Sequence, residues 1–131
     1  MAYNTITVNH FKEKVVIKFG VESKIAGSIN DIIKAIKEEV SKEKGELVLD
    51  LNNIKWITSM EIGLLMQMYK ILDKKEKKLS IVNAKGYAKN ALESTGTGEL
   101  IKIYNNMDEV YGAEKKGLSI DEMKNIEDLL K

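Results

Sequence analysis

The sequence predicts a single α/β domain, in which a mixed β-sheet with parallel core strands is covered by helices and followed by an extra C-terminal helix. Short apolar runs typical of strands alternate with longer stretches in which apolar residues recur at helical spacing. Between residues 15 and 50 the order is strand, helix, strand, which implies parallel pairing through a right-handed crossover. The length of 131 residues fits one compact domain.

Composition narrows the class of protein. Charged residues make up 31% of the chain and hydrophobic residues 44%, which is ordinary for a globular domain. The 21 basic and 20 acidic residues give a net charge of +1, so no overall excess of positive charge points to nucleic acid or to an anionic membrane. There is no cysteine, and no apolar run is long enough to span a bilayer. The first residues show no export signal, and we expect a cytoplasmic protein.

Two strands open the chain. Residues 5–10 alternate apolar and polar side chains, which is the period-two pattern of a half-buried strand. Residues 15–19 form a second apolar run that ends at Gly20. Because only a short polar link separates the two runs, we expect an antiparallel hairpin.

The first helix is predicted to start after Ser28. Ser28 and Asp31 have the spacing of a capping box, in which the serine caps the helix and the acid binds back to the backbone. The apolar residues of one face are Ile29, Ile32, Ile33, Ile36 and Val40. The opposite face carries Lys34, Lys37, Glu38 and Glu39. Mixed charges of this kind are typical of a solvated surface.

The segment from residue 46 to residue 78 organises the rest of the chain. The apolar run at residues 47–49 is short and precedes an Asn52-Asn53 pair, which favours a buried strand followed by a turn. The loop residues expected to point back to the core are Ile54, Trp56 and Ile57. A long helix then begins.

The start of this helix contains the candidate site. Thr58 is predicted as the N-cap and Glu61 completes a capping box with it. Ser59 then occupies the first helical position, where its hydroxyl is not needed for capping and where the helix end favours an added anion such as phosphate. Two interpretations remain open: Ser59 is a phosphorylation site, or it is an ordinary small polar residue in a first turn.

One face of the helix is apolar and wide. The core stripe consists of Ile62, Leu65, Met66, Tyr69 and Leu72, and the residues that widen it are Met60, Leu64, Met68 and Ile71. Met60 and Leu64 are expected at the rim of this face beside Ser59. They either form part of a partner surface or are covered by another part of the chain.

The chain then continues with a strand, a helix and a last strand. Residues 74–78 are mostly lysine and are interpreted as a solvated helix end, and residues 79–82 form the next strand. A third helix is expected over residues 84–95, with Gly96 ending it. Its inward residues are predicted to be Tyr87, Ala88, Ala91 and Leu92. Residues 100–104 make the last strand, and the Thr-Gly-Thr-Gly run at 95–98 lacks the lysine and the following helix of a phosphate-binding loop.

Beyond residue 112 a short extra helix is expected. Ser119 and Glu122 have capping-box spacing, and the apolar stripe is formed by Ile120, Met123, Ile126 and Leu130. The extension at 113–131 packs on the parent domain, on a second copy of the chain or on a partner, and the sequence does not choose among these.

Little in the sequence favours catalysis. A nucleophilic serine needs a positioned base, and the only histidine, His10, is expected on the first strand as a surface or edge residue. A metal site would have to be all carboxylate, and Asp50, Glu61 and Asp73 have no recognisable ligand spacing. We therefore expect no enzyme activity, no cofactor and no metal.

The central segment resembles a known family. LVLDLNNIKWITSMEIGLLMQMY is similar to the centre of the STAS domain, in which a strand ending in Asp-Leu precedes a loop, an Asp-Ser-Ser/Thr-Gly motif and a helix. Asp50-Leu51 falls on the Asp-Leu, Ser59 on the serine that is phosphorylated in bacterial anti-sigma factor antagonists, and Gly63 on a glycine one turn into the helix. Thr58, Met60 and Glu61 replace the other three motif residues.

The resemblance covers about residues 5–112 and implies a STAS domain at 1–112, with 113–131 as a helical extension of the same domain. It implies an anti-sigma factor antagonist in a partner switch, which binds an anti-sigma factor with serine kinase activity while unphosphorylated. Phosphorylation of Ser59 would release it, and a phosphoserine phosphatase would reset it. The expected partner-binding residues are Thr58, Ser59, Met60, Glu61, Gly63 and Leu64. The alternative is a STAS scaffold of a larger signalling complex without phospho-switching, and a homodimer also remains open.

Overall fold

A five-stranded mixed sheet forms the centre of the molecule. The structure is a computed structural model that describes residues 3–40 and 45–115. The strands lie in the sheet in chain order, β1-β2-β3-β4-β5. Their bounds are β1 Ile6–Phe11, β2 Lys14–Phe19, β3 Glu46–Asp50, β4 Lys78–Val82 and β5 Lys102–Tyr104. β1 pairs antiparallel with β2, and every other pair is parallel, so the predicted hairpin and parallel core are confirmed.

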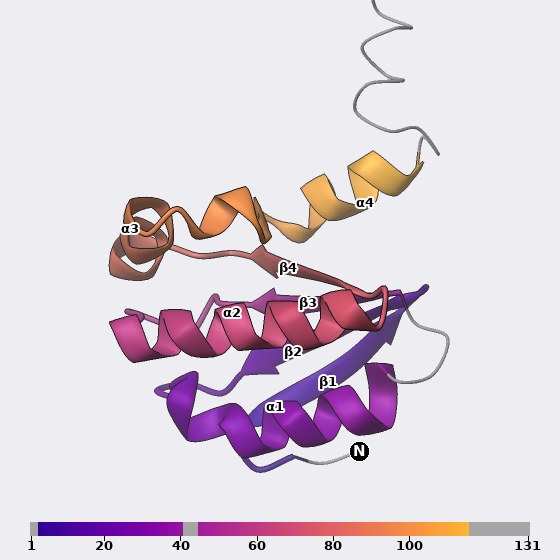
Figure 1. The fold of residues 1–131 in the computed structure, drawn as a ribbon, viewed down its shortest axis with the longest axis horizontal. Helices are drawn as coiled ribbons and strands as arrows, with labels where there is room; N and C mark the ends of the chain where they lie inside the picture. The colour runs from indigo at the N-terminus through magenta and orange to yellow at the C-terminus, as the bar shows by residue number, and fades with distance from the viewer. Residues whose placement is uncertain (1–2, 41–44, 116–131) are drawn as a thin grey trace, which may run out of the picture.

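Three helices connect the parallel strands: α1 Ile29–Ala35, α2 Ser59–Lys74 and α3 Gly86–Ser94. A fourth helix, α4 Met107–Lys115, follows β5. A 3-10 turn, η1 (Ala26–Ser28), precedes α1, a π-helical turn, η2 (Ile36–Val40), extends it, and a second 3-10 turn, η3 (Thr97–Glu99), follows α3. α1 and α2 run side by side along the sheet, and the start of α2 lies at the same end of the molecule as α3 (Figure 1).

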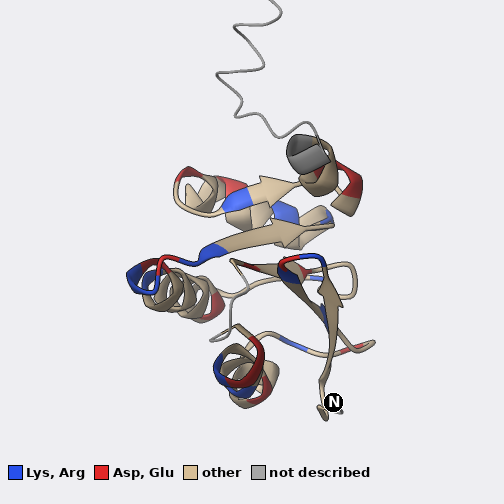
Figure 2. Cartoon of the chain, turned by 90° about the vertical axis from the view of Figure 1, so that its right-hand side faces the viewer, with Lys and Arg blue, Asp and Glu red and all other residues tan. Residues whose placement is uncertain are grey.

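The alternation of side chains along the strands creates the layers. One face of the sheet presents apolar residues that are fully buried against α1, α2 and α3, such as Ile17, Leu49 and Ile81. The alternate residues Val16, Val48 and Val82 pack on the other face, against Val110 of α4 and its neighbours. Viewed along the helices, α1 and α2 lie on one side of the sheet and α4 on the other (Figure 2).

The predicted capping box at the first helix is wrong. Ser28 has φ −105° and ψ 2°, which is not the extended backbone of an N-cap, and its hydroxyl makes no capping bond and is buried without a partner. The Asp31 carboxylate instead accepts hydrogen bonds from the backbone N–H and the hydroxyl of Thr5, at 2.9 and 2.8 Å. The 3-10 turn continues directly into α1, so the chain enters the helix without a capping residue, and Asp31 holds the start of β1.

Four residues expected in the core or in its widened helical stripe are exposed. Ile33, Trp56, Ile71 and Tyr87 have exposed fractions of 41%, 56%, 50% and 72%. The buried face of α1 and the start of η2 consists of Ile32, Ala35 and Ile36. The buried face of α3 consists of Ala88 and Leu92. Ile33 and Tyr87 are each adjacent in sequence to one of these buried residues, which places them about 100° away around the helix.

The predicted lysine-rich end of α2 and the stop at Gly96 agree with the structure. Lys74 is the last residue of α2, and Gly96 has a φ of 68°, the left-handed conformation that ends α3. The expected helix at 119–130 lies outside the described residues. None of the helices that the structure describes has the length and apolar character needed to cross a bilayer.

Candidate functional site at the start of helix α2

A capping box starts α2, as the sequence predicts. Thr58 has φ −82° and ψ 165°, the extended backbone of an N-cap. Its hydroxyl oxygen accepts a hydrogen bond from the backbone N–H of Glu61 at 3.2 Å, and Glu61 Oε1 accepts one from the backbone N–H of Thr58 at 2.9 Å. The two residues therefore satisfy each other's backbone groups and fix the direction in which the helix begins.

Glu61 also ties α2 to a second segment. Its Oε2 accepts a hydrogen bond at 2.9 Å from the backbone N–H of Ala26 in η1, and only 4% of the residue is exposed. Burial alone would raise the pKa of the carboxyl, but hydrogen bonds from the Thr58 and Ala26 N–H groups and the Thr58 hydroxyl, with the charge of Lys24, outweigh it and lower the pKa. Glu61 therefore stays ionised and inside the fold, and its carboxylate is not on the surface where the sequence placed it.

Ser59 is the first residue of α2 and is exposed. The cap is made by Thr58 and Glu61, so the Ser59 hydroxyl takes no part in it. At this position the unpaired N–H groups and the dipole of the 16-residue helix favour negative charge. The hydroxyl is therefore accessible to a modifying enzyme, and an added phosphate is compatible with the local field.

The surroundings of Ser59 are apolar and open. Met60 is 64% exposed, Thr58 and Gly63 are exposed, and Leu64 is half-buried. Leu64 packs against the core cluster, so it contributes only an edge to the surface. Of the six residues expected on the partner surface, four are thus exposed, one is partly exposed and one, Glu61, is internal.

Sequence reasoning missed two aromatic residues at this end of the molecule. The rings of Trp56 and Tyr87 lie with centroids 6.3 Å apart and with their planes at 50°, and both side chains are largely exposed. Trp56 stands three residues before Ser59, in the loop between β3 and α2. The spacing of Ala88 and Leu92 was the signal that could have removed Tyr87 from the core, since both lie on one helical face and Tyr87 does not.

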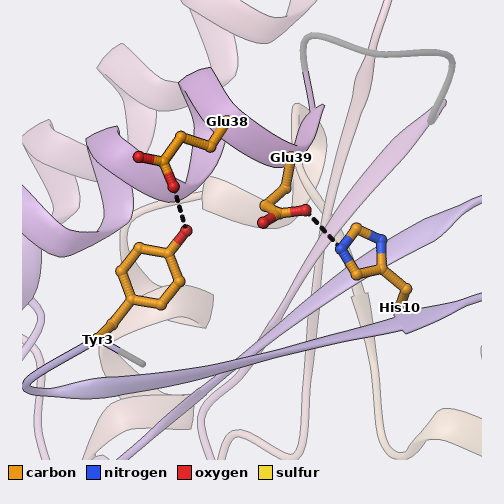
Figure 3. A network of polar contacts seen from close by, with 4 residues as sticks. All are labelled: Tyr3, His10, Glu38 and Glu39. Atoms are coloured by element: carbon orange, nitrogen blue, oxygen red, sulfur yellow. Dashed lines mark hydrogen bonds and ion pairs between the residues drawn. The ribbon is translucent and has the colours of Figure 1, made fainter. Parts of the chain in front are cut away.

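The histidine and the carboxylates lie elsewhere. His10 Nε2 lies 2.6 Å from Glu39 Oε2, and Tyr3 donates a hydrogen bond to Glu38 at 3.0 Å, so both contacts join the start of the chain to the turn after α1 (Figure 3). Asp50 accepts hydrogen bonds from the backbone N–H of Asn52 and from the Asn83 amide. Within residues 3–40 and 45–115, no group of three or more histidines, cysteines and acids is placed to hold a metal ion.

Comparison with known proteins identifies the family. The model of the STAS domain matches residues 7–110, which include the site and all of the sheet except Ile6, the first residue of β1. The chain belongs to the STAS domain family. The resemblance found in the central segment is thereby confirmed, as is the predicted fold class.

Solved structures share this STAS fold. A Thermotoga maritima protein described as an anti-sigma factor antagonist has 16% identity and a TM-score of 0.73, with 84% of this chain and 94% of that chain covered. An anti-sigma factor antagonist from Mycobacterium paratuberculosis has 22% identity and a TM-score of 0.68, covering 85% and 93%. The anti-sigma factor antagonist SpoIIAA, solved in its unphosphorylated form, has 14% identity and a TM-score of 0.61, covering 87% and 98%. No curated protein matches the sequence significantly.

Proposed function

We propose that this STAS domain is an anti-sigma factor antagonist controlled by phosphorylation of Ser59. In its unphosphorylated form it binds an anti-sigma factor that is also a serine kinase, through Thr58, Ser59, Met60, Gly63 and Leu64. Phosphorylation by that kinase releases it, and a phosphoserine phosphatase restores binding. The domain works in the cytoplasm and is itself no enzyme, because the kinase supplies the base, metal and nucleotide of phosphoryl transfer.

One observation carries the proposal: Ser59 is exposed at the first position of α2, outside a capping box that is complete without it. A structural serine at a helix start normally supplies the cap itself. Here Thr58 does so, which leaves the Ser59 hydroxyl for another role. The three solved structures described as anti-sigma factor antagonists support the proposal through their shared fold.

The surroundings of Ser59 explain how a phosphate would act as a switch. A phosphoserine carries close to two negative charges at neutral pH. In the free protein this charge faces solvent and the positive end of α2. In a complex the same charge would be held beside Met60, whose exposed side chain is part of the contact surface and offers neither a hydrogen bond nor an opposite charge. The phosphate therefore weakens the complex more than it disturbs the free domain.

The test compares two substitutions at Ser59. The anti-sigma kinase of the source organism is purified, and its affinity for the wild type, Ser59→Asp and Ser59→Ala is measured by calorimetry without nucleotide. We expect Ser59→Ala to bind like the wild type and Ser59→Asp to bind about tenfold more weakly or worse, which is about 1.4 kcal/mol or more. With ATP, the wild type should gain one phosphate, located on Ser59 by mass spectrometry, and Ser59→Ala should gain none.

Equal binding of the wild type and Ser59→Asp would contradict the switch. It would leave the alternative that the domain is a scaffold of a larger signalling complex. A phosphate on a residue other than Ser59 would contradict the assignment of the site.

A further inference from the structure

The start of α3 and the loop before Ser59 form one connected surface. The backbone N–H of Ala88 donates a hydrogen bond to the carbonyl oxygen of Lys55 at 3.2 Å. Lys85, just before α3, donates one from its ammonium group to the Asn52 side chain at 2.6 Å. Figure 1 shows α3 and the start of α2 at the same end of the sheet. A partner that covers Ser59 would therefore also meet the start of α3.

This surface exposes large apolar side chains. Trp56, Met60 and Tyr87 have exposed fractions of 56%, 64% and 72%, and the two aromatic rings contact each other. Trp and Tyr are the side chains most enriched among residues that dominate binding energy at protein interfaces. Full burial of these rings would stabilise the isolated domain more than their exposed contact does.

The charged side chains of the two segments that form this surface have one sign. Residues 51–60 and 83–91 contain Lys55, Lys85 and Lys89 and no aspartate or glutamate, whereas the whole chain has nearly equal numbers of acids and bases. All three lysines are exposed, and within the described part of the chain none of them forms an ion pair with a carboxylate. At the opposite end of the molecule, which faces the viewer in Figure 2, acidic and basic residues are intermixed along α1 and η2. Lysines are also frequent at that end, at residues 74–78, but Asp73 and Glu76 accompany them, whereas the two segments beside Ser59 contain no acid.

We propose that Trp56, Met60 and Tyr87, flanked by these three lysines, dock an acidic segment of the anti-sigma factor that carries apolar side chains. The inference rests on the proposed function and names the chemistry of the partner. The apolar side chains of the segment pack on the aromatic pair, and its carboxylates face the lysines. Complementary charge of this kind sets the register of an interface and speeds association.

The same charges give phosphorylation a second effect. A phosphate on Ser59 adds nearly two negative charges to a surface that holds three positive ones. It offsets much of the attraction for an acidic segment and repels that segment's carboxylates directly. The switch therefore acts through electrostatic repulsion of the partner in addition to the loss of apolar contact at Met60.

The test uses the same purified anti-sigma kinase and variants of exposed residues. We expect Trp56→Ala and Tyr87→Ala each to weaken binding about tenfold or more, and Tyr87→Phe to keep most of the affinity. The double charge reversal Lys85→Glu with Lys89→Glu should weaken binding at low salt, and the difference from wild type should shrink as salt rises. The matched control is Lys74→Glu with Lys75→Glu, because these exposed lysines lie at the other end of α2, about 24 Å away. Thermal melting of each variant confirms that it is folded.

The outcomes separate this inference from the proposed function. If Ser59→Asp loses binding while the aromatic and lysine variants bind like the wild type, the acidic docking segment is wrong and the switch stands. If the control reversal weakens binding as much as Lys85→Glu with Lys89→Glu, the lysines act only through the net charge of the domain. That result would contradict the proposal that the acidic segment docks beside Lys85 and Lys89. If the wild type does not bind the kinase, both proposals fail. Sedimentation of the domain alone adds a further check, since a dimer that Trp56→Ala dissociates would assign the aromatic pair to a second copy of the chain.

Discussion

Glu61 is the residue on which the geometry of the site depends. Its carboxylate accepts hydrogen bonds from the backbone of Thr58 in the cap and from the backbone of Ala26 in η1, so one side chain joins two segments that are 35 residues apart. Only 4% of the residue is exposed, and removing the carboxylate would leave buried N–H groups without a partner. The position of Ser59 therefore depends on an ionised acid that is itself buried inside the domain.

This dependence predicts how stability changes with pH. The pKa of Glu61 is lowered in the folded state, so its stabilising contribution is fully present above the ordinary value of 4.5 and is lost as pH falls through the lower, folded-state pKa. Glu61→Gln keeps the shape but can no longer accept both bonds, and it should cost about 1–3 kcal/mol at pH 7. Below pH 4.5 the difference between the variant and the wild type should narrow. Urea unfolding of both proteins between pH 3 and pH 7 measures this.

The control for this experiment is Glu93→Gln, which changes an exposed glutamate on α3. It should change stability little at any pH. Asp31 supplies a background slope in all three proteins, because the hydroxyl and backbone N–H of Thr5 lower its pKa as well. A constant difference between Glu61→Gln and the wild type over the whole range would contradict the role assigned to the ionised carboxylate.

At the scale of elements, two glycines should respond in opposite directions to the same change. Gly96 ends α3 with a φ of 68°, a conformation that costs an alanine about 1 kcal/mol, although a Cβ there would meet nothing closer than 3.8 Å. Gly63 lies in the exposed face of α2, where a Cβ would meet nothing within 4 Å. Gly96→Ala should therefore destabilise the domain by about 1 kcal/mol, and Gly63→Ala should stabilise it by about 0.5–1 kcal/mol. Urea denaturation measures both, and a stabilised Gly96→Ala would show that the turn after α3 can change its conformation.

The elements themselves could be predicted because their signals are local. Three signals depend only on neighbours in sequence, and the structure contains the element that each of them predicts. They are the alternation in residues 5–10, the apolar runs of the parallel strands and the Thr58–Glu61 capping box. The capping box at Ser28 failed for a reason that is not local. The Asp31 carboxylate accepts its hydrogen bonds from Thr5, which is 26 residues away. The spacing of residues within the helix cannot predict a contact of that kind.

The aromatic surface could not be predicted for a different reason. Sequence patterns assign large apolar residues to the core because such residues are usually buried. Trp56 and Tyr87 depart from that rule. The spacing of Ala88 and Leu92 places Tyr87 outside the buried face of α3, but it does not indicate the contact with Trp56, which depends on how α3 packs against the loop before α2. Departures of this kind are expected at sites of interaction, where stability is not the only constraint.

At the scale of the whole molecule, the helix that carries the site is packed on the main core of the domain. The core cluster combines residues from four of the strands with residues from α1, α2 and α3, and Leu65, Met68 and Leu72 fix α2 to it along most of its length. Ser59 lies at the outer end of this helix, exposed and outside the core. A charge placed there can change what the domain binds without changing how it folds.

The last prediction follows from that arrangement. Ser59→Asp, which should weaken binding about tenfold or more, should leave the free energy of unfolding unchanged or raise it by up to about 1 kcal/mol, because the new carboxylate faces the positive end of α2. Its amide NMR spectrum should differ from that of the wild type only for residues near the start of α2 and the facing loop. Ser59→Lys is the matched control: it places the opposite charge at the same position and should lower stability by a similar amount. Shifts spread through the β-sheet, or a marked loss of stability in Ser59→Asp, would show instead that phosphorylation acts by altering the fold, and the lost binding would then have to be explained by local unfolding of the helix start.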